Sequence, residues 1–230
     1  MKNILLGLTC LLLFVCIGCK IGEDGSQPVR QFYSFDQAVT LESVKKEYLL
    51  NDIIWLDIKI PNKEMVDLTT GKTVKVGNAR FVPVLDLYDP FVADNTTDKF
   101  VLFPNTGEVV EDKDFQDGGN VLLAFGCPES SYSMRVGIQL KKEGGYFLTF
   151  HKSSPILQFF FTESSDCSIQ DVFPPPAEAS IGSVTFKLDA SDTNKDKLDE
   201  YAAGFPNFTG NLATIREALD NKTAFFVRVK

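Results

Sequence analysis

The sequence predicts a mainly β protein, a β-sandwich that carries a C-terminal α+β segment. Beyond the first thirty residues, most apolar residues recur at every second position, which is the period of a half-buried strand. The runs are short and end at turn residues, a pattern typical of a sandwich. The hydrophobic share of 44% and the 20 Phe residues are sufficient for a core built on aromatic packing.

The first strands are predicted directly after this N-terminal stretch. In one of them Pro61 ends a run of aliphatic residues that share a face, namely Ile54, Leu56, Ile58 and Ile60. Trp55 lies on the opposite face, either as an exposed aromatic or as a second-layer core residue. The stretch LTTGKTVKV, residues 68–76, predicts a hairpin that turns near its glycine. A further strand is predicted over residues 80–88, where Pro83 indicates a sheet edge or a bulge.

The middle of the chain predicts more strands. Apolar runs over residues 99–103, 121–125 and 156–161 indicate short buried strands. SMRVGIQLKKEGGYFLTF, residues 133–150, holds two alternating runs joined by a turn with paired glycines, which predicts a β-hairpin. Its end, GGYFLTF, resembles the penultimate strand of immunoglobulin-like modules in bacterial surface proteins, where a tyrosine packs at the corner between sheets. The resemblance implies an immunoglobulin-like β-sandwich with Tyr146 at that corner.

The pattern changes after a proline-rich stretch, PPPAEAS. We predict a sandwich domain over residues 31–170, a Pro-rich linker over 171–182, and a segment over 183–230 that packs on the sandwich. This last segment is expected to be strand, helix, helix and strand, because helical spacing replaces period two between its ends.

Two helices are expected inside this segment. The first, over residues 195–203, has Thr193 and Asp196 at the spacing of a capping box. The second follows Asn211 and places Leu212, Ile215 and Leu219 at helical spacing. Residues 223–229 predict the closing strand.

The N-terminus predicts export and lipidation. Lys2 precedes an uncharged run over residues 4–17, which is too short to span a membrane and fits a signal peptide over 1–18. Ile17-Gly18-Cys19 resembles the lipobox of bacterial lipoproteins, which implies cleavage before Cys19 and acylation of its sulfur, although the family prefers Leu where Cys16 stands. The alternative is a redox pair of Cys16 and Cys19, but Cys16 lies inside the apolar run instead of an electropositive setting.

Residues 19–30 are expected to form a lipidated, flexible tether. Lys20 followed by Glu23 and Asp24 is similar to the surface-export signal of Bacteroides-type lipoproteins. This similarity implies an outer-membrane location with the protein facing outward, held by several acyl chains that include palmitate-type chains. The alternative is a plain polar tether.

Two further sites follow from residue types. An exported chain favours a disulfide between Cys127 and Cys167, with two buried reduced cysteines as the alternative. The loop EDKDFQDGGN offers candidate calcium ligands, Asp112, Asp114, Asp117 and Asn120, with a solvated turn as the alternative. The loop DTNKDKLDE, residues 192–200, resembles an EF-hand only at its first oxygen positions and is interpreted as a polar helix start.

No motif assigns a reaction. The net charge of −8 argues against nucleic acid as a partner. His151 is the only histidine, which excludes multi-histidine metal sites, and it is expected to be exposed at a strand end. The sequence contains no G-x-S-x-G, P-loop or G-x-G-x-x-G, and we predict neither a catalytic residue nor a cofactor.

The expected function is therefore a non-catalytic binding or assembly role at the outer membrane. The membrane is reached through the lipid anchor, and an envelope protein or a glycan is the expected partner. Two alternatives stay open at this point: a carboxylate-based envelope hydrolase and a structural accessory subunit.

Overall fold

The computed structural model describes residues 30–79, 81–92, 99–110, 120–126, 130–150, 156–163 and 179–230. Gln31–Lys230 forms one compact unit, and Met1–Arg30 divides from it as a second one. The strands are β1 (Phe32–Glu42), β2 (Ile53–Pro61), β3 (Glu64–Val66), β4 (Thr73–Lys75), β5 (Asn78–Ala79), β6 (Val84–Tyr88), β7 (Phe100–Thr106), β8 (Glu108–Val110), β9 (Asn120–Ala124), β10 (Ser131–Leu140), β11 (Gly144–Phe150), β12 (Ile156–Thr162), β13 (Ser180–Asp189) and β14 (Ala224–Val229). The helices are α2 (Lys195–Ala202) and α3 (Leu212–Asp220).

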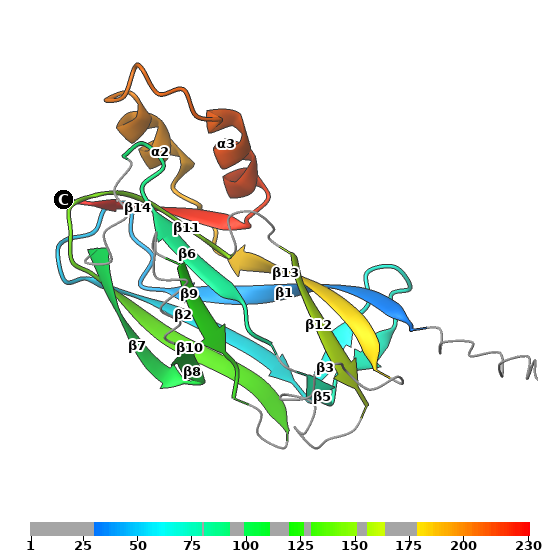
Figure 1. Cartoon of the computed structure of the whole chain (residues 1–230). Helices are drawn as coiled ribbons and strands as arrows, with labels where there is room; N and C mark the ends of the chain where they lie inside the picture. Colours follow the sequence, from blue (N-terminus) through cyan, green and yellow to red (C-terminus); the bar gives the residue numbers. More distant parts are fainter. Residues whose placement is uncertain are drawn as a thin grey trace, which may run out of the picture. The chain divides into compact units, whose positions relative to one another are not determined.

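Two sheets enclose the core of the larger unit (Figure 1). Sheet A has seven strands in the order β5-β12-β13-β1-β2-β10-β7, and sheet B has five in the order β14-β11-β6-β9-β8. Strands β1 and β13 pair in parallel, while the other pairs within the two sheets are antiparallel. The predicted class, a mainly β sandwich with a C-terminal helical segment, is confirmed.

Period-two patterning decides which side chains face the core. Ile54, Leu56, Ile58 and Ile60 of β2 are all buried, as predicted. Val136 of β10 stands opposite Leu56, so the alternating residues of both strands enter the same core. The hairpin predicted near Gly71 is also confirmed, with β3 and β4 as its arms and a positive φ of 69° at the glycine.

The GGYFLTF strand behaves as its resemblance implies. Tyr146 is buried in the core, and its hydroxyl donates to the carbonyl oxygens of Lys142 and Glu143, at 3.0 and 3.1 Å. A buried tyrosine that bonds back to the preceding turn fixes how the chain enters β11.

The predicted hairpin over 133–150 is wrong, although both of its strands exist. Strand β10 pairs with β2 and β7 in sheet A, whereas β11 pairs with β14 and β6 in sheet B. The turn therefore carries the chain from one sheet to the other. Both runs bury their apolar face, so alternation alone does not distinguish a hairpin from such a crossing.

Two other strand predictions are corrected. The run at 99–103 was expected to be buried, but Val101 and Phe103 of β7 are 42% and 41% exposed because β7 is an edge strand of sheet A. The strand predicted over 80–88 is shorter than expected, because β6 begins only at Val84, directly after Pro83. The preceding strand, β5, lies in sheet A and β6 lies in sheet B, so the chain changes sheets between them.

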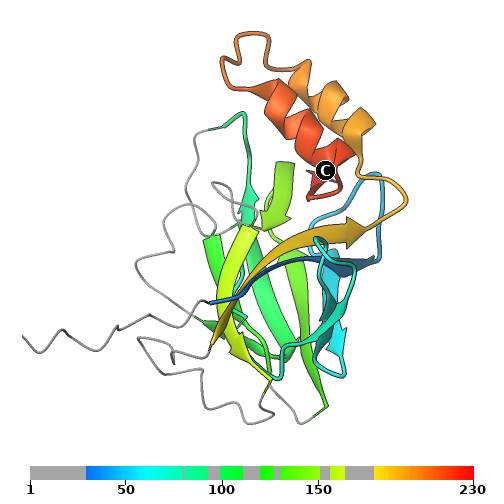
Figure 2. The same cartoon turned by 90° about the vertical axis from the view of Figure 1, so that its right-hand side faces the viewer.

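The C-terminal segment contributes to both sheets. Strand β13 lies beside β1 in sheet A, and β14 lies beside β11 in sheet B. The two helices lie together on one side of the sandwich (Figure 2). They pack on the outer face of sheet B through a second core cluster: Phe147, Leu198, Leu219, Ala224 and Phe226. The domain division at residues 171–182 stays a prediction, because most of that stretch lies outside the described residues.

The two helix starts differ in how well the sequence predicts them. At α3 the side chain of Asn211 accepts a hydrogen bond from the Thr214 amide, as expected of an N-cap. The capping box predicted for α2 is wrong, since α2 begins at Lys195 and Asn194 is its N-cap in a left-handed conformation. The buried Asn194 side chain instead donates to the carbonyls of Lys45 and Phe226, at 2.7 and 3.0 Å. It thereby ties the start of α2 to the sandwich.

Candidate binding site beside helix α2

Most site residues predicted from the sequence lie outside the described residues. These are Cys19, Cys127, Cys167, Asp112, Asp114, Asp117 and His151. Asn120 opens β9, but its side chain is not described either. Lipidation, the disulfide and the calcium site therefore stay predictions.

The acidic loop at 192–200 is a polar helix start, as interpreted from the sequence. The Lys46 ammonium binds the carboxylates of Asp192 and Asp196, at 2.5 and 2.6 Å. Its hydrogen bonds to these carboxylates, led by the one to Asp192, raise the pKa of Lys46 and lower those of both aspartates. Within the described part of the chain, no group of three or more His, Cys, Asp or Glu residues is arranged to hold a metal ion.

A hollow of about 380 Å³ lies at the C-terminal end of α2. Its walls come from α2 and the turn after it, from the end of β14, and from the loop between β1 and β2, which contributes Glu47. Residues far apart in the sequence thus meet there only because the helices fold over sheet B.

Tyr201 forms the floor of this hollow. A Cβ atom at Gly145 of β11 would lie 2.4 Å from the Tyr201 ring, so only glycine lets the ring pack against that strand. The Tyr201 hydroxyl donates to Asp89 at 2.7 Å. Burial, and then this hydrogen bond, raises the pKa of Tyr201 to about 12. The phenol is therefore neutral and held in place.

Arg228 stands beside this floor. It pairs with Gly145 in the register of β14 and β11, and its guanidinium carbon lies 4.4 Å from the centre of the Tyr201 ring. Among the described residues, no carboxylate forms an ion pair with Arg228. Its hydrogen-bonding fork therefore has capacity for an incoming acidic group.

The other charges of the hollow are fixed in pairs. Lys230 binds Glu47 at 2.6 Å, and Lys197 binds Glu200 at 2.8 Å. The Lys230 hydrogen bond lowers the pKa of Glu47, and the Glu200 hydrogen bond raises that of Lys197. With Arg228, three cationic and two anionic side chains line the hollow.

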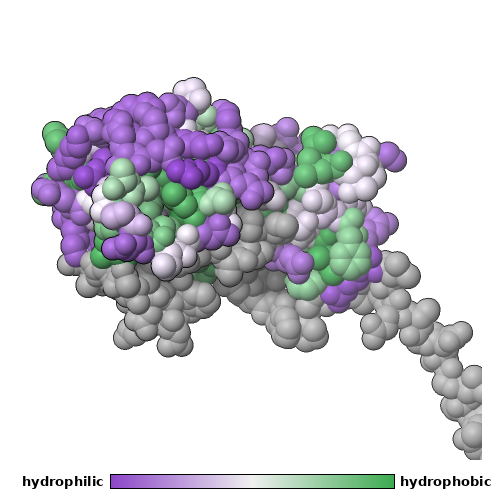
Figure 3. Space-filling model, turned by 90° about the horizontal axis from the view of Figure 1, so that it is seen from above, coloured by the Kyte–Doolittle hydropathy of each residue, from purple (hydrophilic) through white to green (hydrophobic). Residues whose placement is uncertain are grey.

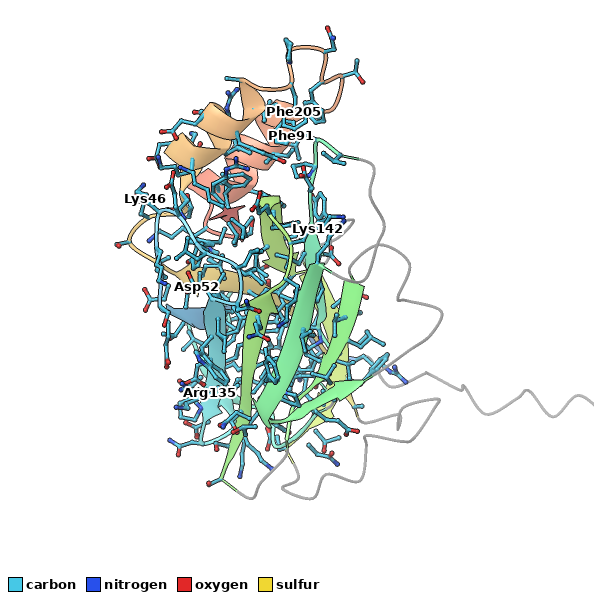
Figure 4. All side chains as sticks on the ribbon, turned by 90° about the vertical axis from the view of Figure 1, so that its left-hand side faces the viewer. Lys46, Asp52, Phe91, Arg135, Lys142 and Phe205 are labelled. Carbon is cyan, nitrogen blue, oxygen red and sulfur yellow. The ribbon has the colours of Figure 1, made fainter. Side chains whose placement is uncertain are left out.

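A second hollow of about 340 Å³ shares Gly204 and Phe205 with the first and is also lined by the rings of Phe91 and Phe208. Phe91 and Phe205 stack with ring centres 5.1 Å apart, and Phe208 lies 4.6 Å from Phe91. Figure 4 shows Phe91 and Phe205 next to each other at the helical end. Seen from above, this side is mainly hydrophilic, with apolar side chains in a limited area (Figure 3).

The outer face of sheet A is less suited to a ligand. Trp55 is half-buried there and covers Gly137, whose Cβ atom would lie 3.0 Å from the ring. The Arg135 guanidinium stacks 5.1 Å from the Trp55 ring and binds Glu42 through two hydrogen bonds of 2.9 and 2.7 Å. Trp55 therefore already has partners from its own chain, and Arg135 has a carboxylate.

Sequence reasoning missed the hollow. Phe205 and Phe208 follow the predicted helix in a stretch without periodicity, and Phe91 stands outside every predicted strand. Arg228 carried a usable signal, since it is the one charged residue of the closing strand and lies on the face opposite Phe225, Val227 and Val229.

Comparison with known proteins identifies no family. No family model matches the chain, and no curated protein matches it. Solved structures with some similarity include the second type II cohesin module of the adaptor ScaA scaffoldin of Acetivibrio cellulolyticus, at 16% identity over 51% of this chain and 72% of that chain, with a TM-score of 0.27. A type II cohesin domain from the cellulosome of the same organism is 13% identical over 64% of this chain and 94% of that one, with a TM-score of 0.31. Similarity this low does not bear on what the chain binds.

Among the described residues, no helix is both long enough and apolar enough to cross a membrane.

Proposed function

We propose that this chain is a lipid-anchored envelope protein of the outer membrane that binds a partner protein without catalysis. The anchor is Cys19, on the sequence argument given above. The binding site is the hollow beside α2, and the group it receives is a carboxylate of the partner, with an apolar neighbour against Phe205.

One observation carries this proposal: the Arg228 guanidinium lies in a hollow beside Tyr201 without a carboxylate of its own among the described residues. Guanidinium binds carboxylate through two parallel hydrogen bonds, which gives both affinity and orientation. Tyr201 holds one side of the guanidinium, so less side-chain freedom is lost on binding.

The paired charges favour binding over the alternative of a carboxylate hydrolase. A glycosidase-type acid needs a carboxyl group with a raised pKa. Glu47 has a lowered pKa because Lys230 binds it, and Glu200 is bound by Lys197. Both carboxylates therefore serve to position lysines at the rim.

The test is a titration with phenylacetate, which carries a carboxylate and a ring. Binding is monitored through the backbone amide signals of the protein in NMR spectra. Signals of Tyr201, Phe205 and Arg228 are expected to shift with phenylacetate and to stay in place with phenylacetamide, which lacks the charge. Substitution R228Q should abolish the shifts, and R228K should weaken them because lysine lacks the fork.

The matched control is R216Q, because Arg216 is an exposed arginine of α3 that already binds Asp199 at 2.7 Å. It should leave the titration unchanged. Equal shifts with phenylacetamide, or equal loss in R216Q and R228Q, would show that the hollow does not select carboxylates.

A further inference from the structure

A second surface lies where β1 begins. Phe32, the first residue of β1, is 74% exposed, the highest fraction among the large apolar side chains of the described residues. Val66 and Leu68, at the nearby hairpin, are each 55% exposed. Exposing such side chains to water costs free energy, so their grouping calls for an explanation.

The backbone brings these residues together. The Leu68 amide donates to the Ser34 carbonyl at 2.7 Å, and the Ser34 amide donates to the Asp67 carboxylate at 3.0 Å. Asp67 also accepts from the amide and hydroxyl of Thr70, at 2.9 and 2.7 Å. The exposed Val66 and Leu68 are therefore held rigidly beside the first residues of β1.

The apolar surface continues across sheet A. In the register of the sheet, Phe32 stands beside Ile181 of β13, and Ile181 stands beside Phe160 of β12. All three alternate with core residues and so lie on the outer face, where Ile181 and Phe160 are half-buried. We call Phe32, Val66, Leu68, Phe160 and Ile181 the β1-start patch.

This outer face also carries ion pairs. Further along the strands, Lys187 binds Asp36 and Arg135 binds Glu42. The β1-start patch is the apolar area at the β1 end of this face, and Val101 and Phe103 form another at the β7 edge. Figure 3 shows hydrophobic groups at the end of the molecule where β1 begins and the β3–β4 hairpin lies.

The position of the patch along the chain identifies its occupant. Twelve residues separate Cys19 from Phe32, so the Cα atoms of these two residues lie at most roughly 45 Å apart when the chain is fully extended. A lipid on Cys19 would therefore keep the start of β1 near the bilayer surface. We propose that the β1-start patch contacts the lipid surface to which Cys19 is anchored, so that the sandwich lies against the membrane at this end.

The inference rests on the proposed anchor, and the two are tested separately. Substitutions F32W and L68W are each made in a W55F background, which removes the only native tryptophan. The acylated full-length proteins are purified from the envelope and reconstituted into vesicles of phosphatidylethanolamine and phosphatidylglycerol, with or without bromine on the acyl chains. Both indoles should emit at shorter wavelength and lose intensity with brominated lipid, because they enter the interface.

The matched control is L49W. Leu49 is as exposed as the patch residues but follows the other end of β1, roughly 33 Å away along the strand. Its indole should not be quenched by brominated lipid. If W55F disturbs folding, F32W and L68W are made in the native chain and compared with their parent.

Each outcome decides something different. Mass spectrometry that finds Cys19 unmodified would remove the anchor and the inference with it. Acylated Cys19 with F32W and L68W as little quenched as L49W would overturn the membrane contact and leave the anchor standing. If aqueous iodide also failed to quench the fluorescence of those indoles, a second copy or another protein would cover the patch. The membrane contact would again be overturned.

Discussion

Two aromatic clusters in this protein use similar ring contacts in different surroundings. In the core, Phe81 lies 4.4 Å from Phe159 and 5.0 Å from Tyr132, measured between ring centres, and all three are buried between the sheets. Beside the helices, Phe205 lies 5.1 Å from both Phe91 and Tyr201, but these rings are only half-buried and border hollows.

The difference shows that ring geometry alone does not define a role. A ring enclosed on all sides contributes its whole surface to stability. A ring that borders a hollow contributes only part of its surface to stability and leaves the remaining surface accessible to a ligand. The core cluster therefore holds the sheets together, while the outer cluster attaches the helical layer and presents a wall.

The largest effect that sharpens this comparison is expected from F81A. Removing the central ring of the core cluster leaves a cavity, and the free energy of unfolding should fall by about 3–5 kcal/mol. Urea denaturation followed by circular dichroism measures it. F205A is the matched variant and should cost clearly less; equal losses would show that the outer cluster is a core too.

An intermediate effect on the free energy of unfolding is expected when Tyr132 and Tyr201 ionise in alkaline solution. Burial, as the largest cause, raises the pKa of Tyr132 and of Tyr201 from the ordinary value of 10.0 to about 12. The folded protein holds these protons more tightly than the unfolded chain does. Their stabilising contribution is thus complete below pH 10 and is lost as pH rises toward 12.

Substitutions Y132F and Y201F should each flatten this fall in stability, as measured by urea unfolding on both sides of pH 10. Y132F should also cost about 1–3 kcal/mol at neutral pH, because the buried Ala79 amide loses its acceptor. Y201F, which loses one bond to Asp89 near the surface, should cost about 1 kcal/mol. The reverse order would contradict the division into core and outer clusters.

The smallest effect is expected from K46M. Lys46 links the β1–β2 loop to the start of α2, but the pair is exposed, so its loss should cost about 0.2–1 kcal/mol. The effect should shrink further in high salt. K59M, which removes the pair between the exposed Lys59 and the largely buried Asp57 on sheet A, is the control and should leave the spectrum of the outer aromatic cluster unchanged. A loss of helical signal in K46M alone would show that this link holds α2 in place.

The alternation of apolar and polar residues predicted the strands well because it reports directly which face of a strand is buried. It could not assign β10 and β11 to different sheets, since both bury the same kind of face. It also predicted β7 as buried, because an apolar run does not reveal that a strand has a neighbour on one side only.

The candidate site was beyond sequence reasoning for a related reason. Phe91, Phe205 and Arg228 belong to three separate segments, and no local period links them. Their meeting depends on α2 packing over Gly145, a contact set by tertiary structure. The N-cap at Asn211, in contrast, was predictable, because its hydrogen bond spans three residues.

The pairing of β1 with β13 bears on when the molecule becomes complete. Nine residues of the first strand, from Phe32 to Thr40, find their partners between Ile181 and Asp189, whereas only three pair with β2. Closing so long a loop is entropically costly and slows folding. Sheet A therefore lacks the main partner of its first strand until the last quarter of the chain has been synthesised.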